Sequence, residues 1–174
     1  MKRFKPVMLG IVILLFAVTA LLWLLGGRTF QYRAEVLVAA APEQVFFHLT
    51  DPALLKQWIG GLVESTPMGD STLRVGAKSR EVIEENGRRF EMQSEVLRLE
   101  ANRLLEVSLQ NDFGQTISRY QLEPDNGRTR LTHTMHTNYK GLFVRLMAPF
   151  IGRAVQSKLD KDFNQLKRLA EKNR

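Results

Sequence analysis

The stretch APEQVFFHLTDPALLKQW (Ala41–Trp58) decides the fold, because it holds two short helical patterns joined by an Asp-Pro pair. Pro42 suits the first turn of a helix, while Asp51 before Pro52 ends that helix and can cap the next one. Apolar residues recur at helical spacing in both pieces: Val45, Phe46 and Leu49 in the first, Leu54, Leu55 and Trp58 in the second. Each piece is too short to be stable alone, so we expect the pair to close one end of a sheet.

Strand patterns lie on both sides of this helix pair. Residues 29–40 alternate before it, and turn residues separate six further strand patterns after it. These six patterns are 62–68, the two arms of a hairpin within 77–100, 103–110, 115–124 and 129–138. The Asn86-Gly87 pair marks the turn of that hairpin, and a second turn at Asp125-Asn126-Gly127 joins 115–124 to 129–138. We interpret Glu81, Glu84 and Glu85, which lie near this turn, as a solvated edge.

A long amphipathic helix is predicted at the end of the chain, over residues 142–171. Its apolar stripe consists of Ile151, Val155, Leu159, Phe163 and Leu166. Pro149 should kink this helix or mark where its main part begins. The order of one strand, two short helices, six strands and one long helix predicts an α+β fold, with helices on one face of a curved antiparallel sheet. A concave, mostly apolar space between sheet and helix is a typical binding site for a small ligand.

Three stretches of the sequence resemble the START-like superfamily of helix-grip domains, also called Bet v 1-like or SRPBCC, which includes polyketide cyclase-related and quinone-binding proteins. The stretches are VAAAPEQVFFHLTDPALLKQW, TISRYQLEPDNGRTRLTHTMHT and LDKDFNQLKRLAE. The resemblance covers about residues 30–171. It implies a helix-grip fold whose members bind lipids, polyketides, hormones or quinones, many of them with no known reaction. Fold alone does not fix activity.

We expect the chain to have two parts: an N-terminal anchor (1–28) and a START-like domain (29–174). Residues 7–25 are free of charge and long enough to cross a hydrocarbon core of about 30 Å. We expect an uncleaved, single-pass transmembrane helix. Basic residues before the span outnumber those after it, which places the domain on the outer side, in the periplasm of a bacterial source.

Charge distribution argues against nucleic-acid binding. The formal net charge is +7, but residues 29–144 carry 13 basic and 15 acidic residues, so the excess lies at the two ends. A basic stripe interleaved with aromatic residues would be expected of a nucleic-acid protein. The chain has no cysteine, which excludes disulfides and thiolate metal sites. The sequence identifies no protein partner and no oligomeric state.

Metal and catalytic patterns are weak. His133 and His136 are three apart in a strand, so they point to opposite faces and cannot share one ion. His48 is the remaining histidine, and a zinc site needs three or four converging ligands. No Gly-x-Ser-x-Gly elbow and no phosphate-binding glycine loop is present. We therefore predict no metal, no cofactor and no catalytic residue.

Strand parity and helix stripes select the residues expected to face a ligand cavity between the sheet and the C-terminal helix. They are Phe46, Trp58, Met92, Ser94, Tyr120, His133, Met135 and Phe150. The favoured hypothesis is a membrane-anchored, non-enzymatic domain that binds a hydrophobic small molecule or lipid. One alternative is a cyclase or aromatase-like enzyme that uses Tyr120 and His133. Another is an interaction module whose basic last helix contacts a protein or anionic lipid head groups.

Overall fold

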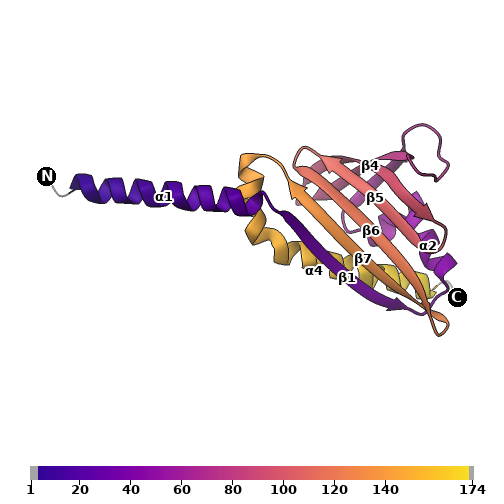
Figure 1. Ribbon diagram of the computed structural model, residues 1–174. Coiled ribbons are helices and arrows are strands. Elements are labelled where there is room, and N and C mark those ends of the chain that lie inside the picture. Colours follow the sequence, from indigo (N-terminus) through magenta and orange to yellow (C-terminus); the bar gives the residue numbers. More distant parts are fainter. Residues whose placement is uncertain (1–3, 173–174) are drawn as a thin grey trace.

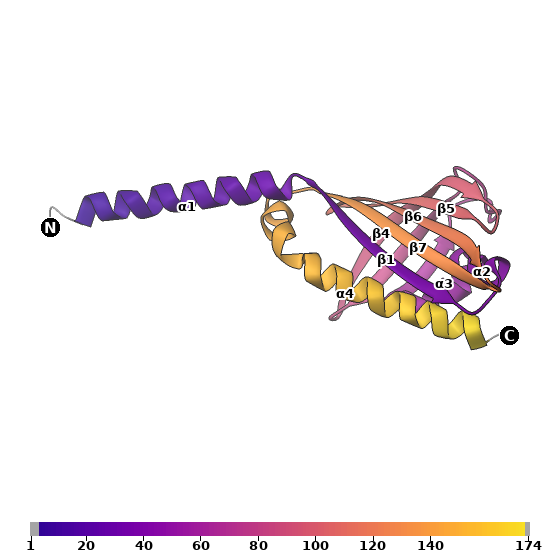
Figure 2. The ribbon, with the colours of Figure 1, turned by 60° about the horizontal axis from the view of Figure 1, so that its bottom comes forward.

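The computed structural model describes residues 4–172. The first helix, α1 (Phe4–Gly26), projects away from the rest of the chain (Figures 1 and 2). Its segment Met8–Gly26 has a mean hydropathy of 2.8 and is exposed or half-buried up to Leu25, so it is long and apolar enough to cross a membrane. A signal sequence shares these features. Lys2 and Arg3, which contribute to the expected orientation, lie outside the described residues.

A single antiparallel sheet forms the body of the described domain. Its seven strands follow the spatial order β1-β7-β6-β5-β4-β3-β2. The strands are β1 (Thr29–Val38), β2 (Leu62–Pro67), β3 (Lys78–Glu85), β4 (Arg88–Glu100), β5 (Leu104–Asn111), β6 (Gly114–Asp125) and β7 (Arg128–Tyr139). The expected α+β helix-grip architecture is confirmed, with one strand before the short helices and six after them.

Two tight turns fix the register of the sheet. Asn86 and Gly87 have φ angles of 52° and 73°, and Asn126 and Gly127 have 51° and 76°. Positive φ at both central residues is typical of the two-residue hairpin turn that matches strand twist. The first turn pairs Glu85 with Arg88, and the second joins β6 to β7. The predicted hairpin turns are confirmed.

The two short helices, α2 (Pro42–Thr50) and α3 (Pro52–Trp58), lie at the end of the sheet farthest from α1 (Figures 1 and 2). Asp51 links them as a cap: its Oδ1 accepts from the backbone N of Ala53 at 2.8 Å and of Leu54 at 2.9 Å. These bonds satisfy amide groups that would otherwise lack a partner at a helix start. The expected role of Asp51 is confirmed.

The last helix, α4 (Leu142–Lys172), contains Pro149, runs beside β1 and changes direction after its first turns (Figures 1 and 2). A proline inside a helix removes one backbone bond and produces such a bend. Beyond the bend, Phe163, Leu166 and Ala170 are buried against the sheet and the short helices.

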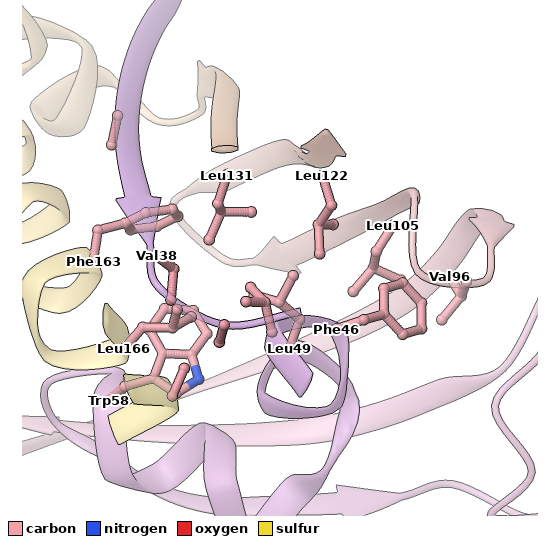
Figure 3. Packing of buried hydrophobic residues seen from close by; sticks show 14 residues of the cluster. Val38, Phe46, Leu49, Trp58, Val96, Leu105, Leu122, Leu131, Phe163 and Leu166 are labelled. Carbon is pink, nitrogen blue, oxygen red and sulfur yellow. The ribbon is translucent and has the colours of Figure 1, made fainter. Parts of the chain in front are cut away.

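The hydrophobic core lies where α2, α3 and α4 meet one face of the sheet (Figure 3). Trp58 packs edge to face on Phe163, with ring centroids 5.9 Å apart. Its indole Nε1 donates to the carbonyl oxygen of His48 at 2.9 Å. This bond satisfies a polar group that would be costly to bury alone. The core therefore joins the end of α3 to α2 and α4.

Candidate functional site

A pocket of ≈ 170 Å³ lies between the short helices and the half of the sheet formed by β2 to β6. Its lining is mostly apolar, as is typical of sites for small ligands. The lining residues are Leu49, Thr50, Pro52, Leu55, Ile59, Leu62, Ser65, Leu73, Ser79, Glu81, Ile83, Met92, Ser94, Val96, Leu105, Val107, Leu109 and Tyr120. A cavity of about 150 Å³ is known to hold benzene, so this pocket accommodates at least one ring.

The pocket does not lie where the sequence placed it. We expected a cavity between the sheet and the C-terminal helix, but none of the described lining residues belongs to α4. Phe163 and Leu166 of α4 are 3% and 0% exposed and fill the space over β1 and β7. The other half of the sheet face is covered by α2 and α3, which are too short to fill it. The open space therefore lies under these two helices.

Three predicted site residues come together in this pocket. Met92 and Ser94 line it from β4, and Tyr120 lines it from β6. Burial raises the pKa of the Tyr120 hydroxyl against a hydrogen bond with Ser118, and the carboxylates of Asp162 and Glu81 raise it further. The hydroxyl is therefore protonated at neutral pH and is able to donate a hydrogen bond.

Two predicted site residues belong to the core instead. Phe46 is 8% exposed and Trp58 4% exposed, and neither is among the lining residues of the pocket. Figure 3 shows Phe46 beside Leu105 and Val96, which do line the pocket. Phe46 and Trp58 thus support the pocket from the packed side.

His133 and Met135 of β7 also stay outside the lining. His133 is 2% exposed, and neither of its ring nitrogens has a hydrogen-bond partner in the part of the chain that is described. Burial lowers its pKa from 6.5 to about 4, so the ring is neutral at pH 7. Met135 is half-buried. The expectation that both face the ligand is not met, because the pocket ends at β6.

Phe150 lies on the surface rather than in a cavity. Its side chain is 65% exposed. The first turns of α4 lie at the end of the sheet from which α1 projects (Figure 2). The prediction was wrong for Phe150, because a period of about 3.6 residues turns its side chain away from the stripe of Ile151, Val155 and Leu159, which are half-buried.

Among the titratable lining residues of the pocket, Glu81 is the one that sequence reasoning missed. We interpreted it as part of a solvated edge, but it is 8% exposed and lines the pocket from β3. Ser65 Oγ and Ser94 Oγ donate to its Oε1 at 3.1 and 3.3 Å. Burial raises the pKa of this carboxyl, and the two serine bonds lower it. The signal was present in the hairpin register, which pairs Glu81 with the inward-facing Met92.

The two histidines of β7 are placed as predicted. His133 is buried and His136 is exposed, on opposite faces of the strand. Across residues 4–172, no group of three His, Asp or Glu side chains is arranged to hold a metal ion. The polar groups of the pocket are therefore a carboxyl, a phenol and several hydroxyls.

Comparison with known families gives a match over residues 29–171, to the family described as "Polyketide cyclase / dehydrase and lipid transport". The chain belongs to this family. The match spans the whole domain after α1, and the seven-stranded sheet with its short and long helices is the helix-grip fold of this superfamily. A comparison with curated protein sequences finds no match.

Solved structures share the fold of this domain. A protein from Chromobacterium violaceum is 18% identical with a TM-score of 0.65, covering 81% of this chain and 96% of that one. Ara h 8.0201 is 12% identical with a TM-score of 0.64, covering 82% and 98%. The di-domain ARO/CYC StfQ from the steffimycin biosynthetic pathway is 11% identical with a TM-score of 0.69, covering 83% and 51%. At these identities the similarity establishes the fold alone.

Proposed function

We propose that this domain binds a hydrophobic small molecule or lipid in the pocket under α2 and α3, and that α1 anchors it in a membrane. The observation that carries the proposal is the pocket itself, an apolar space with a few polar groups. Family membership supports it, since the family is described by polyketide cyclisation and lipid transport. The ligand class follows from the lining, whose side chains favour apolar contact on most sides.

Binding is favoured over catalysis by the placement of the two candidate catalytic groups. A cyclase-like mechanism based on Tyr120 and His133 needs both side chains to reach the same bound molecule. Tyr120 lines the pocket, whereas His133 is stacked beside it within the core. A phenol alone can orient a ligand oxygen, which is a binding role.

The membrane part of the proposal rests on α1 and on the helix surface beside it. The last turn of α1 packs against the first turns of α4: a Cβ atom on Gly26 would lie 1.8 Å from the carbonyl oxygen of Arg145. The Arg145 guanidinium lies 5.5 Å from the centroid of the Trp23 ring. Tryptophan and arginine are typical residues at the level of lipid head groups. We therefore place this junction at the membrane surface.

Exposed apolar side chains continue this surface onto α4. Leu142, Phe143, Met147 and Phe150 are 62%, 74%, 39% and 65% exposed. An exposed cluster of this kind is unusual on a soluble domain, and its continuity with α1 indicates a lipid surface as its occupant. The exposed Lys140 and Arg153 would meet anionic head groups. The charges that flank α1 in the sequence favour an extracytoplasmic domain.

Native mass spectrometry of the full chain, extracted in mild detergent, tests the proposal. We expect a stoichiometric small molecule to remain bound, and to be identified after release as a lipid or other largely apolar compound. A mass equal to that of the chain alone, from several independent preparations, would contradict the binding function.

A further inference from the structure

Glu81 is the one carboxyl among the described lining residues of the pocket. Its Oε1 accepts hydrogen bonds from two serines on the neighbouring strands, Ser65 of β2 and Ser94 of β4. Its Oε2 is buried and has no hydrogen-bond partner within residues 4–172. A buried carboxyl oxygen without a partner is costly, so a further hydrogen bond to Oε2 would stabilise this group.

No cation compensates this carboxyl among the residues that the structure describes. The nearest basic residue on β3, Arg80, points to the other face of the sheet and pairs there with Glu64 and Glu91 at 3.0 Å each. The groups that surround Glu81 on the pocket side are hydroxyls and apolar side chains, and the titratable one is Tyr120. In such surroundings burial favours the protonated form of the carboxyl, and the two serine hydrogen bonds offset part of that preference.

Protonation gives the carboxyl a defined hydrogen-bond role. The two serine hydroxyls donate to Oε1, so Oε1 acts as an acceptor and the proton belongs on Oε2. Rotation about the last side-chain torsion of a glutamate is easy, because that torsion has broad preferences. Such a rotation turns the O–H group toward a molecule in the pocket without moving the strand, at some cost to the bonds that Ser65 and Ser94 donate to Oε1.

We propose that the protonated Glu81 carboxyl donates a hydrogen bond to a carbonyl or ether oxygen of an otherwise apolar ligand. This inference rests on the proposed function and narrows its ligand class to apolar molecules with one hydrogen-bond acceptor near one end. The apolar lining holds the body of the molecule, while Glu81 fixes its orientation. A site with one precisely placed polar group selects strongly against an analogue that lacks the matching atom.

Three probes of nearly equal shape separate the possibilities: acetophenone, which has an acceptor oxygen, ethylbenzene, which has none, and 1-phenylethylamine, which is cationic. The full chain, in lipid nanodiscs at pH 7 and with ¹³C-labelled methionine methyl groups, is titrated with each at equal free aqueous concentration. The Met92 methyl reports the pocket, because Met92 lines it and pairs with Glu81. The Met147 methyl, on the exposed surface of α4, reports partition into lipid.

We expect Met92 to show acetophenone binding about twofold to tenfold tighter than ethylbenzene, the range that one hydrogen bond supplies. Glu81→Gln should keep this preference, since an amide also donates, and Glu81→Met should abolish it. Thermal unfolding of each variant establishes that it is folded.

Three results would overturn the inference, and each contradicts a different part of the account. Equal binding of ethylbenzene and acetophenone would refute the role of Glu81 while leaving the proposed binding function intact. Tightest binding of the amine, lost in Glu81→Gln, would show that Glu81 acts as an anion. Failure of all three probes to move the Met92 signal would count against the pocket as a ligand site, and so against both proposals.

Discussion

The imidazole of His133 stacks on the ring of Tyr120, with centroids 4.3 Å apart and planes 8° apart. Phe163 lies parallel to the imidazole at 5.2 Å. This aromatic group joins β6, β7 and α4, and it separates the filled half of the sheet face from the open pocket. His133 therefore packs within the core, while Tyr120 lines the pocket.

Burial of His133 predicts a loss of stability in acid. The pKa falls from 6.5 in the unfolded chain to about 4 in the folded one, so the unfolded state binds more protons between these values. The stabilisation is fully present above pH 6.5 and is lost as pH falls toward 4, amounting to about 3 kcal/mol. Urea unfolding from pH 4 to 7 should show this slope, and His133→Phe should flatten it. An unchanged slope in the variant would refute this assignment.

Burial of Glu81 predicts the opposite dependence of folding stability on pH. Because burial raises its pKa, the folded state holds the proton more tightly, and the associated stability is lost as pH rises through the folded value. Glu81→Gln should therefore raise the melting temperature at pH 8 and change it little at pH 4. The exposed Glu85→Gln serves as the matched control and should have no effect at either pH. A lower melting temperature for Glu81→Gln at pH 8 would show that the ionised carboxylate is the stabilising form.

The Asp51 cap should stabilise α3, one of the two short helices that cover the pocket. Asp51→Ala removes both bonds to the first turn of α3, which should lower the free energy of unfolding by about 1 kcal/mol. Asp51→Asn keeps an acceptor oxygen and should retain most of that stability. Chemical denaturation measures both variants. Equal stability of Asp51→Ala and wild type would mean that the cap does not hold α3.

We expect the exposed apolar side chains at the start of α4 to contact the membrane. The chain has no cysteine, so single cysteines at Phe143 and Phe150 can carry an environment-sensitive fluorophore without further changes. In vesicles, both should show blue-shifted emission and quenching by lipid-attached quenchers. A label at Arg128, exposed at the opposite end of the sheet, should show neither. Equal quenching at all three positions, or at none, would contradict the membrane contact.

Local signals in the sequence were sufficient for the fold. The Asn86-Gly87 and Asn126-Gly127 turns and the Asp51 cap each depend on neighbouring residues, and the structure has them where the sequence predicts them. The position of the cavity was not predictable in the same way. It depends on where α4 bends and how far α2 and α3 extend over the sheet, which are properties of packing between distant segments.

Two residues were placed wrongly from the sequence: Glu81 was expected at the surface and is buried, and Phe150 was expected in the cavity and is exposed. Composition suggested that Glu81, near two other glutamates, faces solvent, although the register of its hairpin places it opposite Met92. Phe150 was grouped with the apolar stripe of α4, although a period of about 3.6 residues turns it away from Ile151, Val155 and Leu159, and its side chain is exposed. In both cases the register or the helical period, which the sequence already held, pointed to the observed placement.

The most direct test of the account compares two variants that add the same large side chain to β5. Val107→Trp fills the pocket, whereas Gln110→Trp places the ring on an exposed position of the same strand. Native mass spectrometry of both full chains, once each is verified as folded, measures the fraction that carries a bound small molecule. We predict that Gln110→Trp retains the occupancy of the unmodified chain and that Val107→Trp loses it. Equal occupancy in the two variants would contradict a binding site under α2 and α3.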